Sequence, residues 1–221
     1  IPGITKTSFS YDQAKSIQYE SGDFATEISC GNFHTLVLQK INGIQKLTAF
    51  GAGTKQSTDL FAEKFDFGQS IIPTKIKDIE QNILYIGSGP FHNGVIYSNG
   101  QNLYGYMGWG YGTSEDAWIQ SKLFSKKIIN FSMGDEHVVI LFEDGSTECL
   151  CNDNNDGKCD ISKNPNLKYI KFKHIYAKGN ITVAVDKDNI PYIFGDLKDN
   201  LESIPPRSEE HTSELQSRQY L

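Results

Sequence analysis

The chain lacks any long hydrophobic run, although 38% of its 221 residues are hydrophobic and 12% are aromatic. A helix that crosses a membrane needs about 20 consecutive apolar residues, and no stretch of the sequence approaches that length. We therefore expect no membrane partner. The apolar residues are instead spread over many short runs, which is typical of a globular protein with a packed core.

An excess of positive charge is also missing. The chain has 21 Lys and Arg against 27 Asp and Glu, which gives a net charge of −6 at pH 7. Proteins that bind nucleic acids usually carry a basic face or stripe, whereas the lysines here lie in scattered groups. The charge balance therefore argues against a nucleic-acid partner.

Cysteine is scarce, and the four in the chain are Cys30, Cys149, Cys151 and Cys159. Their spacing lacks the Cys-x-x-Cys and His pattern of a zinc site. Cys30 lies in a run that the sequence predicts to be buried. We therefore expect reduced, partly buried thiols, no metal and no cofactor, in a protein of the cytoplasm or nucleus.

The run 152–160 is the part of the chain that most resembles a metal site. Its polar residues from Asn152 to Gly157 imitate the first, third, fifth and sixth positions of a calcium-binding loop. The twelfth position, where a bidentate Glu belongs, is Lys163. We therefore interpret this run as a turn without metal.

One pattern is present four times along the chain. Each copy begins with a glycine, and in three copies a histidine follows three residues later. An apolar run, a tight turn and a pair such as Phe50-Gly51 complete the copy. The glycines are Gly31, Gly89, Gly134 and Gly179, and the histidines are His34, His92 and His137. The glycines of successive copies are 45 to 58 residues apart, which is the length of one small structural unit. A pattern that recurs at such intervals indicates a stack of similar units.

Each copy has the composition of antiparallel β-strands. Short runs of Val, Ile, Leu and Tyr are bounded by turn pairs such as Asn99-Gly100 and Asp144-Gly145, which accept the positive backbone angles of hairpins. No copy has the three- and four-residue apolar spacing of a helix. The sequence therefore predicts an all-β fold, an incomplete β-propeller of about four antiparallel blades. The repeats centre on residues 28–51, 86–107, 131–151 and 176–195.

This order of residues resembles the repeat of the regulator of chromosome condensation family, a seven-bladed β-propeller. The resemblance covers roughly residues 24–201. The departures are Phe50, Tyr106, Leu150 and Phe194 in the usual place of Trp, Met107 and Cys151 in place of the following Gly, and the absence of the fourth His. A ring of seven blades needs more residues than this chain has, so we expect a partial propeller within residues 1–206.

The resemblance implies that the repeated histidines are structural, each ring bonding across strands near the central channel. Their repetition supports this role, because a catalytic or metal site is used once, whereas a residue present in successive blades serves every blade. No pairing of a nucleophile with a base, phosphate loop or carboxylate pair stands out. We therefore expect no enzyme activity, and an enzyme at the channel mouth is the weakest alternative.

The resemblance also implies a protein partner. The leading hypothesis is a protein-interaction propeller with guanine-nucleotide exchange on a small GTPase as its best-known activity, although no stretch matches the wedge on which that exchange depends. The alternative is a regulatory or scaffold arm of a larger protein, such as a ubiquitin ligase or a cytoskeletal regulator. As binding residues we single out Trp109, Tyr111 and Trp118, which lie in a Gly-rich connection. They could equally cover the edge of a blade.

The longest insertion, residues 53–70, contains Phe61, Phe65 and Phe67, which we expect to pack down onto the propeller. The glycosylation patterns at Asn130 and Asn180 fall inside predicted blade cores, so we interpret both as chance.

The last segment, residues 207–221, does not follow the repeat. It resembles the translation of a sequencing-library adapter, and we treat it as a non-native tail. We expect the chain to be a fragment with further blades on both sides.

Overall fold

The computed structural model describes residues 22–53, 66–100, 103–110, 121–151 and 153–196. In these residues the strands form four antiparallel sheets in chain order. The first sheet contains β1 (Phe24–Cys30), β2 (His34–Ile41) and β3 (Ile44–Gly51), and the second contains β4 (Ile83–Ser88), β5 (His92–Ser98), β6 (Tyr104–Gly110) and β7 (Lys122–Phe124). The third contains β8 (Ile128–Met133), β9 (His137–Phe142) and β10 (Thr147–Cys151), and the fourth contains β11 (Phe172–Lys178), β12 (Ile181–Asp186) and β13 (Pro191–Gly195).

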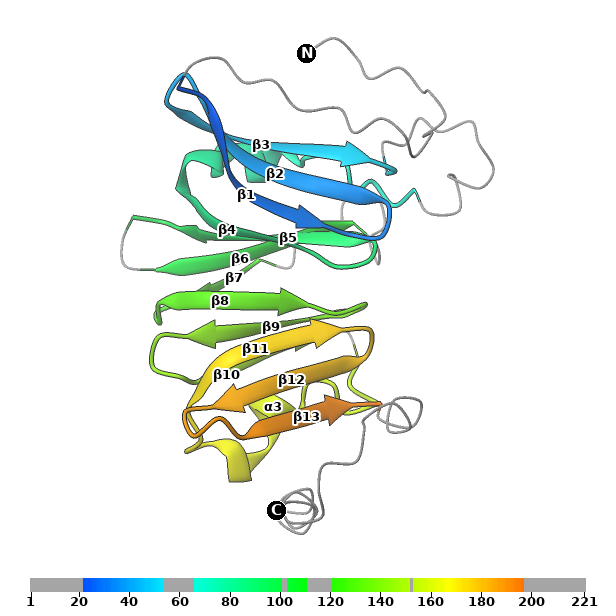
Figure 1. Cartoon of the computed structure of the whole chain (residues 1–221), viewed down its shortest axis with the longest axis vertical. Helices are drawn as coiled ribbons and strands as arrows, with labels where there is room; N and C mark the ends of the chain where they lie inside the picture. Colours follow the sequence, from blue (N-terminus) through cyan, green and yellow to red (C-terminus); the bar gives the residue numbers. More distant parts are fainter. Residues whose placement is uncertain (1–21, 54–65, 101–102, 111–120, 152, 197–221) are drawn as a thin grey trace.

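The four sheets follow one another along the long axis of the molecule, from β1–β3 to β11–β13 (Figure 1). The first strands of neighbouring sheets lie beside one another, β1 with β4, β4 with β8 and β8 with β11. Sheets of antiparallel strands that succeed one another in this way are the blades of a propeller. The structure confirms the prediction of an all-β, incomplete β-propeller.

Strand β9 shows why this sequence forms a stack of sheets. All six of its residues are buried. Val138 and Ile140 belong to the core shared with the second sheet, whereas Val139 and Leu141 belong to the core shared with the fourth. A strand covered on both faces has no polar alternation, which explains the unbroken apolar run in the sequence. Each such side chain contributes about 1.5–3 kcal/mol on full burial.

Three apolar cores fill the spaces between successive sheets. The first contains Leu36, Leu38, Leu47, Ile76, Ile83, Ile86, Val95 and Trp109. The second contains Ile96, Tyr106, Ile128, Phe131, Met133, Val138, Ile140 and Phe142. The third contains Val139, Leu141, Cys149, Cys159, Ile161, Phe172, Ile175 and Ala184. Each sheet is therefore held by its neighbours.

Short helices occupy two of the connections between sheets. Helices α2 (Thr74–Asp78) and η1 (Glu80–Asn82) precede the second sheet, and α3 (Asp160–Lys163) and η2 (Pro165–Leu167) precede the fourth. Ile76 and Ile161 anchor α2 and α3 in the cores. None of the helices in the described part of the chain has the length and apolar character needed to span a membrane.

The face of the fourth sheet that points away from the third is partly apolar and exposed. Tyr176, Val183 and Ile193 are paired across the three strands, and the side chains of Tyr176 and Ile193 are 59% and 41% exposed.

Candidate protein-binding end of the propeller

The turns between the first and second strands of the four sheets lie along one side of the molecule, at the same edge of each sheet (Figure 1). They comprise residues 31–33, 89–91, 134–136 and 178–180, and we call them, with the histidines that follow, the histidine rim. Backbone hydrogen bonds join the first turn to the second and the third to the fourth: Asn32 N–H donates to the Pro90 carbonyl at 3.0 Å, and Asp135 N–H donates to the Gly179 carbonyl at 2.9 Å. The second and third turns lie close together, because a Cβ built on Gly89 would lie 2.7 Å from the Gly134 carbonyl oxygen. The rim is therefore a connected surface.

Two of the histidines bond to the next sheet. His34 Nε2 lies 2.7 Å from Asn93 Oδ1, and His137 Nε2 lies 2.8 Å from Thr182 Oγ1. Asn93 and Thr182 are fully buried. Because a side-chain amide oxygen only accepts, His34 must donate through Nε2. Each acceptor occupies the second position of the next sheet's middle strand. For His92, the residue at this position of the next sheet is Val138, whose side chain has no polar atom.

The histidines of the rim are neutral. Burial lowers the pKa of His92 and of His137 to about 4, and it also lowers the pKa of His34. The Nδ1 atoms of His34 and His137 are buried and have no hydrogen-bond partner among the described residues. An unprotonated Nδ1 and a donating Nε2–H define one tautomer, which suits a fixed bond between sheets and does not suit proton transfer.

The glycine of each rim turn makes room for its own histidine. A Cβ built on Gly31, Gly89 or Gly134 would lie 2.1–2.2 Å from Cε1 of the histidine three residues later. It would also lie 2.6–2.7 Å from the carbonyl oxygen of the glycine in the next turn. No side chain fits such a space, so these three positions require glycine.

The prediction that Gly179 fills the same slot is wrong. Ala177 pairs with Thr182 as Cys30 pairs with Thr35, so Lys178 corresponds to Gly31 and Ile181 to the histidine. A Cβ on Gly179 would meet nothing within 4 Å. Since Ile181 carries no imidazole, the fourth turn has no ring for which the glycine must make room, and a lysine is accommodated there.

Trp109 is a core residue and not a loop residue, which corrects its assignment to the binding surface. It lies in β6, is 5% exposed, and its Nε1–H donates to the Gln69 carbonyl at 3.1 Å. His92 pairs with Gly110 as His34 pairs with Gly51. Trp109-Gly110 is therefore the aromatic-glycine pair of the second sheet, in place of Tyr106-Met107. The second hairpin is longer than the third, and the Trp-Gly dipeptide was the signal available in the sequence.

The other two predicted binding residues, Tyr111 and Trp118, lie outside the described residues. The same holds for Phe61 and Phe65 of the insertion, and for Asn152.

An aromatic cluster takes the place of Trp109 on the rim. Phe33 and Phe91 occupy the same position in successive turns, and their ring centroids lie 6.0 Å apart. Phe67 contacts Phe91 edge-on at 5.5 Å, which confirms the packing role expected for Phe67. Phe33 remains 43% exposed. We call Phe33, Phe67 and Phe91 the aromatic part of the rim.

Gln69 fixes the segment that carries Phe67. Its side chain is fully buried, and its backbone carbonyl accepts hydrogen bonds from Asn93 Nδ2 at 2.7 Å and from Trp109 Nε1. The end of the insertion is therefore held by the second sheet, and Phe67 is presented from a rigid support. Nothing in the sequence pattern marked Gln69, because its contribution is made by the backbone.

The cysteines differ from the sequence prediction. Cys149 and Cys159 form a disulfide, so the expectation of reduced thiols is wrong for this pair. Cys151 is half-buried and free, and Cys30 is exposed. Cys30 was expected to be buried, but it ends the alternating strand β1 on its outward face.

The disulfide closes a loop at the rim, beside His137, because Cys151 pairs with that histidine across β9 and β10. The ammonium of Lys158 lies inside this loop, 3.2 Å from Asp156 Oδ2 and 3.5 Å from Asp153 Oδ1, and its side chain is 3% exposed. Asp156, the carboxylate of the calcium-like pattern, thus faces a lysine. No group of three or more His, Cys, Asp or Glu suited to a metal gathers within the described residues.

The rim is acidic on the side of the third sheet. Asp135 and Glu136 form the tip of the third turn, and Asp153 and Asp156 lie in the disulfide loop. We call these four residues the acidic part of the rim. An aromatic part on the first two sheets and an acidic part on the third thus share one side of the molecule.

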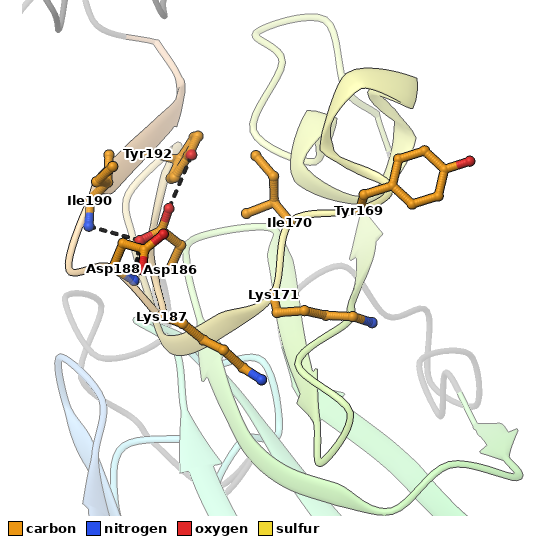
Figure 2. Close-up of a pocket in the computed structure, with 8 residues that line it drawn as sticks. All are labelled: Tyr169, Ile170, Lys171, Asp186, Lys187, Asp188, Ile190 and Tyr192. Carbon is orange, nitrogen blue, oxygen red and sulfur yellow. Dashed lines mark hydrogen bonds between the residues drawn. The ribbon is translucent and has the colours of Figure 1, made fainter.

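A shallow pocket of about 450 Å³ lies at the opposite end of the fourth sheet (Figure 2). Its lining residues are Tyr169, Ile170, Lys171, Asp186, Lys187, Asp188, Ile190 and Tyr192. The Asp186 carboxylate accepts from the N–H groups of Asp188 and Ile190 and from the Tyr192 hydroxyl. Because this carboxylate closes its own hairpin, the pocket has no convergent polar group for a ligand.

Comparison with known proteins supports the fold. No family model matches the chain, and no curated relative matches it. Among solved structures, the CRINKLY WD40 ectodomain of the Arabidopsis thaliana receptor kinase ACR4 is similar with a TM-score of 0.56 and 18% identity over 84% of this chain and 56% of that chain. Prp20p from Saccharomyces cerevisiae has a TM-score of 0.54 and 19% identity over 81% of this chain and 47% of its own. Human WBSCR16 has a TM-score of 0.55 and 16% identity, over 86% and 54% respectively.

These likenesses are too distant in sequence to show more than the fold. The chain spans about half the length of the solved chains that it matches.

Proposed function

We propose that this chain is a protein-binding propeller and that the histidine rim is its binding surface. The observation that carries the proposal is the exposed Phe33 ring, stacked on Phe91 along one side of a rigid set of sheets. Loops and turns on a rigid scaffold are the usual binding sites of such folds. Aromatic side chains give large contact area at a small cost in conformational entropy.

The two parts of the rim define the chemistry of the partner. The aromatic part favours an apolar contact, and the acidic part favours a basic one, because complementary charge speeds encounter and selects among partners. A partner with a hydrophobic anchor flanked by Lys or Arg fits both. Lys158, buried between Asp153 and Asp156, offsets part of their charge, so Asp135 and Glu136 contribute most of the acidic character.

Within this class, the repeats are of the regulator of chromosome condensation type, and exchange of guanine nucleotide on a small GTPase is the more specific function. The likeness to Prp20p, whose structure was described together with its binding to Gsp1p and histones, supports a protein partner of that kind. A regulatory or scaffold arm of a larger protein is the second candidate. It is favoured by the similarity to a receptor-kinase ectodomain. Neither function makes the chain an enzyme in its own right.

The test uses the full-length protein as bait, with small GTPases in nucleotide-free and nucleotide-loaded form as the first candidate partners. Phe33→Ser and Asp135→Lys alter the two parts of the rim. Tyr169→Ser is the matched control, because that ring is 83% exposed at the opposite end of the fourth sheet. Each rim variant should weaken binding by about tenfold or more, as expected for an interface anchor, while the control binds like wild type. Folded rim variants with undiminished binding would place the site elsewhere.

A further inference from the structure

We infer that Asn180 is an N-glycosylation site and that the chain folds in an oxidising compartment of the secretory route. The segment Asn180-Ile181-Thr182 has the acceptor pattern. From the sequence it was expected to lie inside a blade core. The structure places Asn180 in the turn between β11 and β12, with its side chain exposed. The pattern is therefore accessible.

The space around this turn suits a bulky, hydrated group. A Cβ on the preceding Gly179 would meet no atom within 4 Å. The backbone carbonyl of Asn180 is held by Asp196 N–H at 3.3 Å. A fixed backbone with an outward side chain at a surface turn is the setting in which an N-linked glycan can be carried without disturbing the fold.

The disulfide is a second and independent observation. Cys149 and Cys159 are bonded, and Cys159 is fully buried in the core between the third and fourth sheets. Disulfides of this kind persist in the secretory route and outside the cell, whereas thiols in the cytosol are kept reduced. N-linked glycans are added in the same oxidising environment. The disulfide and the exposed acceptor thus point to one compartment. It differs from the cytoplasm or nucleus expected from the sequence, and it favours the arm of a larger protein over exchange on a small GTPase as the proposed function.

The presence of Thr182 has a separate structural reason, because its hydroxyl bonds to His137. The threonine alone is therefore no evidence for a glycan, and the argument depends on Asn180. The other pattern, Asn130-Phe131-Ser132, has an exposed asparagine as well. It lies within β8, the first strand of its sheet, with β4 and β11 beside it. A glycan there would crowd neighbouring strands, so Asn180 alone is assigned.

The experiment examines the full-length protein from the cells that make it, with free thiols blocked before lysis. Peptide mass spectrometry should find N-acetylglucosamine and hexose on the peptide that contains residue 180, removable by peptide N-glycosidase. It should find the Asn130 peptide unmodified and Cys149 linked to Cys159. An unmodified Asn180 in this protein overturns the assignment, whatever the state of the cysteines.

Variants of the secreted full-length chain separate the acceptor from the structural threonine. Asn180→Gln should abolish the glycosidase-sensitive change in mobility while keeping the contact between Thr182 and His137. Thr182→Ser should retain the change, because serine also completes the pattern. Asn130→Gln should leave it unaltered. A mobility change that survives Asn180→Gln contradicts the proposal. Asn180 lies in the fourth turn of the rim, whereas Phe33 lies in the first, so a glycan at residue 180 and partner binding through Phe33 are separate readouts. Failure of one proposal therefore leaves the other testable.

Discussion

His137 and Thr182 join the third sheet to the fourth through a buried hydrogen bond, with Nε2 and Oγ1 2.8 Å apart. His137 lies at the start of β9 and Thr182 one residue into β12. His34 and Asn93 make the corresponding bond between the first two sheets at 2.7 Å. Polar groups at these depths need such partners, because an unpaired buried donor or acceptor costs more than a made bond contributes.

Loss of the Thr182 hydroxyl should therefore be costly. Thr182→Val keeps the shape of the side chain but leaves the His137 Nε2–H without an acceptor, and we expect unfolding in urea to become easier by about 1–3 kcal/mol. Thr35→Val, at the corresponding position of β2, is the matched control because Thr35 only reaches the exposed Cys30 sulfur. Equal effects of the two substitutions would show that the bond between sheets adds nothing.

The buried histidines should make the fold sensitive to acid. Their pKa in the unfolded chain is near 6.5, and burial lowers the pKa of His92 and His137 to about 4 in the folded protein. Between these values the unfolded chain binds more protons, so their contribution is present above the unfolded pKa and is lost as pH falls toward the folded one. A tenfold difference in proton affinity between the two states corresponds to about 1.4 kcal/mol, so His137 accounts for up to about 3 kcal/mol of the free energy of unfolding.

Urea unfolding across this pH range tests the prediction. His137→Gln should lower stability at neutral pH and flatten the decline toward acid. His174→Gln, a substitution of the exposed histidine on β11, should leave the slope unchanged. If the stability of the wild-type protein does not decline toward pH 4, the rim histidines take up protons without loss of stability, and the prediction is wrong.

Reduction of the disulfide should loosen the loop beside His137. The bond joins residues 10 apart in sequence, and closure of a loop of that size contributes about 2–3 kcal/mol on the chain-entropy account. Cys149→Ser with Cys159→Ser should lower the urea midpoint correspondingly, and dithiothreitol should lower it in wild type but not in the double variant. Cys30→Ser, which removes an exposed free thiol, serves as the control.

Trp109 should affect stability before it affects binding. Trp109→Ala removes a buried ring and its bond to the Gln69 carbonyl, and a loss of about 3–5 kcal/mol is expected for such a truncation. Trp109→Phe keeps most of the ring and loses the donor, so it should cost less. Thermal unfolding of both variants measures the difference. An alanine variant with wild-type stability and impaired binding would restore the surface role predicted from the sequence.

Gly89→Ala should be destabilising because the new Cβ would lie 2.2 Å from His92 Cε1 and 2.7 Å from the Gly134 carbonyl. Overpacking of this kind costs about 1–3 kcal/mol or more. His92→Ala removes the ring but not the carbonyl contact. In that variant, Gly89→Ala should lower the free energy of unfolding by less than it does in the wild type. A double-mutant cycle measures this coupling, and strictly additive effects would disprove it. Gly100→Ala does not serve as a control, since that glycine has a positive φ of 76°.

The repeated pattern was enough to predict the fold, because the apolar runs of β5, β9 and β12 and their turns carry the strand and hairpin signals directly. It placed three glycines and three histidines correctly in the rim turns. It failed where copies differ. Because the second hairpin is longer, the aromatic-glycine pair begins at Trp109 and not at Tyr106. In the fourth turn, the position of the repeated glycine is occupied by Lys178, one residue before Gly179.

The candidate site was harder to foresee. Phe33 and Phe91 stand two residues after the glycine, at a position with no pattern of its own, and only the stacking of sheets brings their rings together. Cys149 and Cys159 have a spacing with no recognised pattern, and the chain must turn back through the loop before their sulfurs meet. The bond from Trp109 Nε1–H to the Gln69 carbonyl is accepted by a backbone atom, which every residue has. The type of residue at position 69 therefore gives no sign of this contact.

The ring of each rim histidine covers its own glycine, and this has an evolutionary consequence. If the glycine mutates first, the new side chain collides with the histidine ring. If the histidine mutates first, one of the two contacts that exclude a side chain at the glycine position is removed. The second change then costs less than it would have cost first. In the fourth turn, Lys178 and Ile181 stand in place of both the glycine and the histidine. Among related chains, we expect turns that have lost the histidine but kept the glycine to be common, and turns with the reverse combination to be rare.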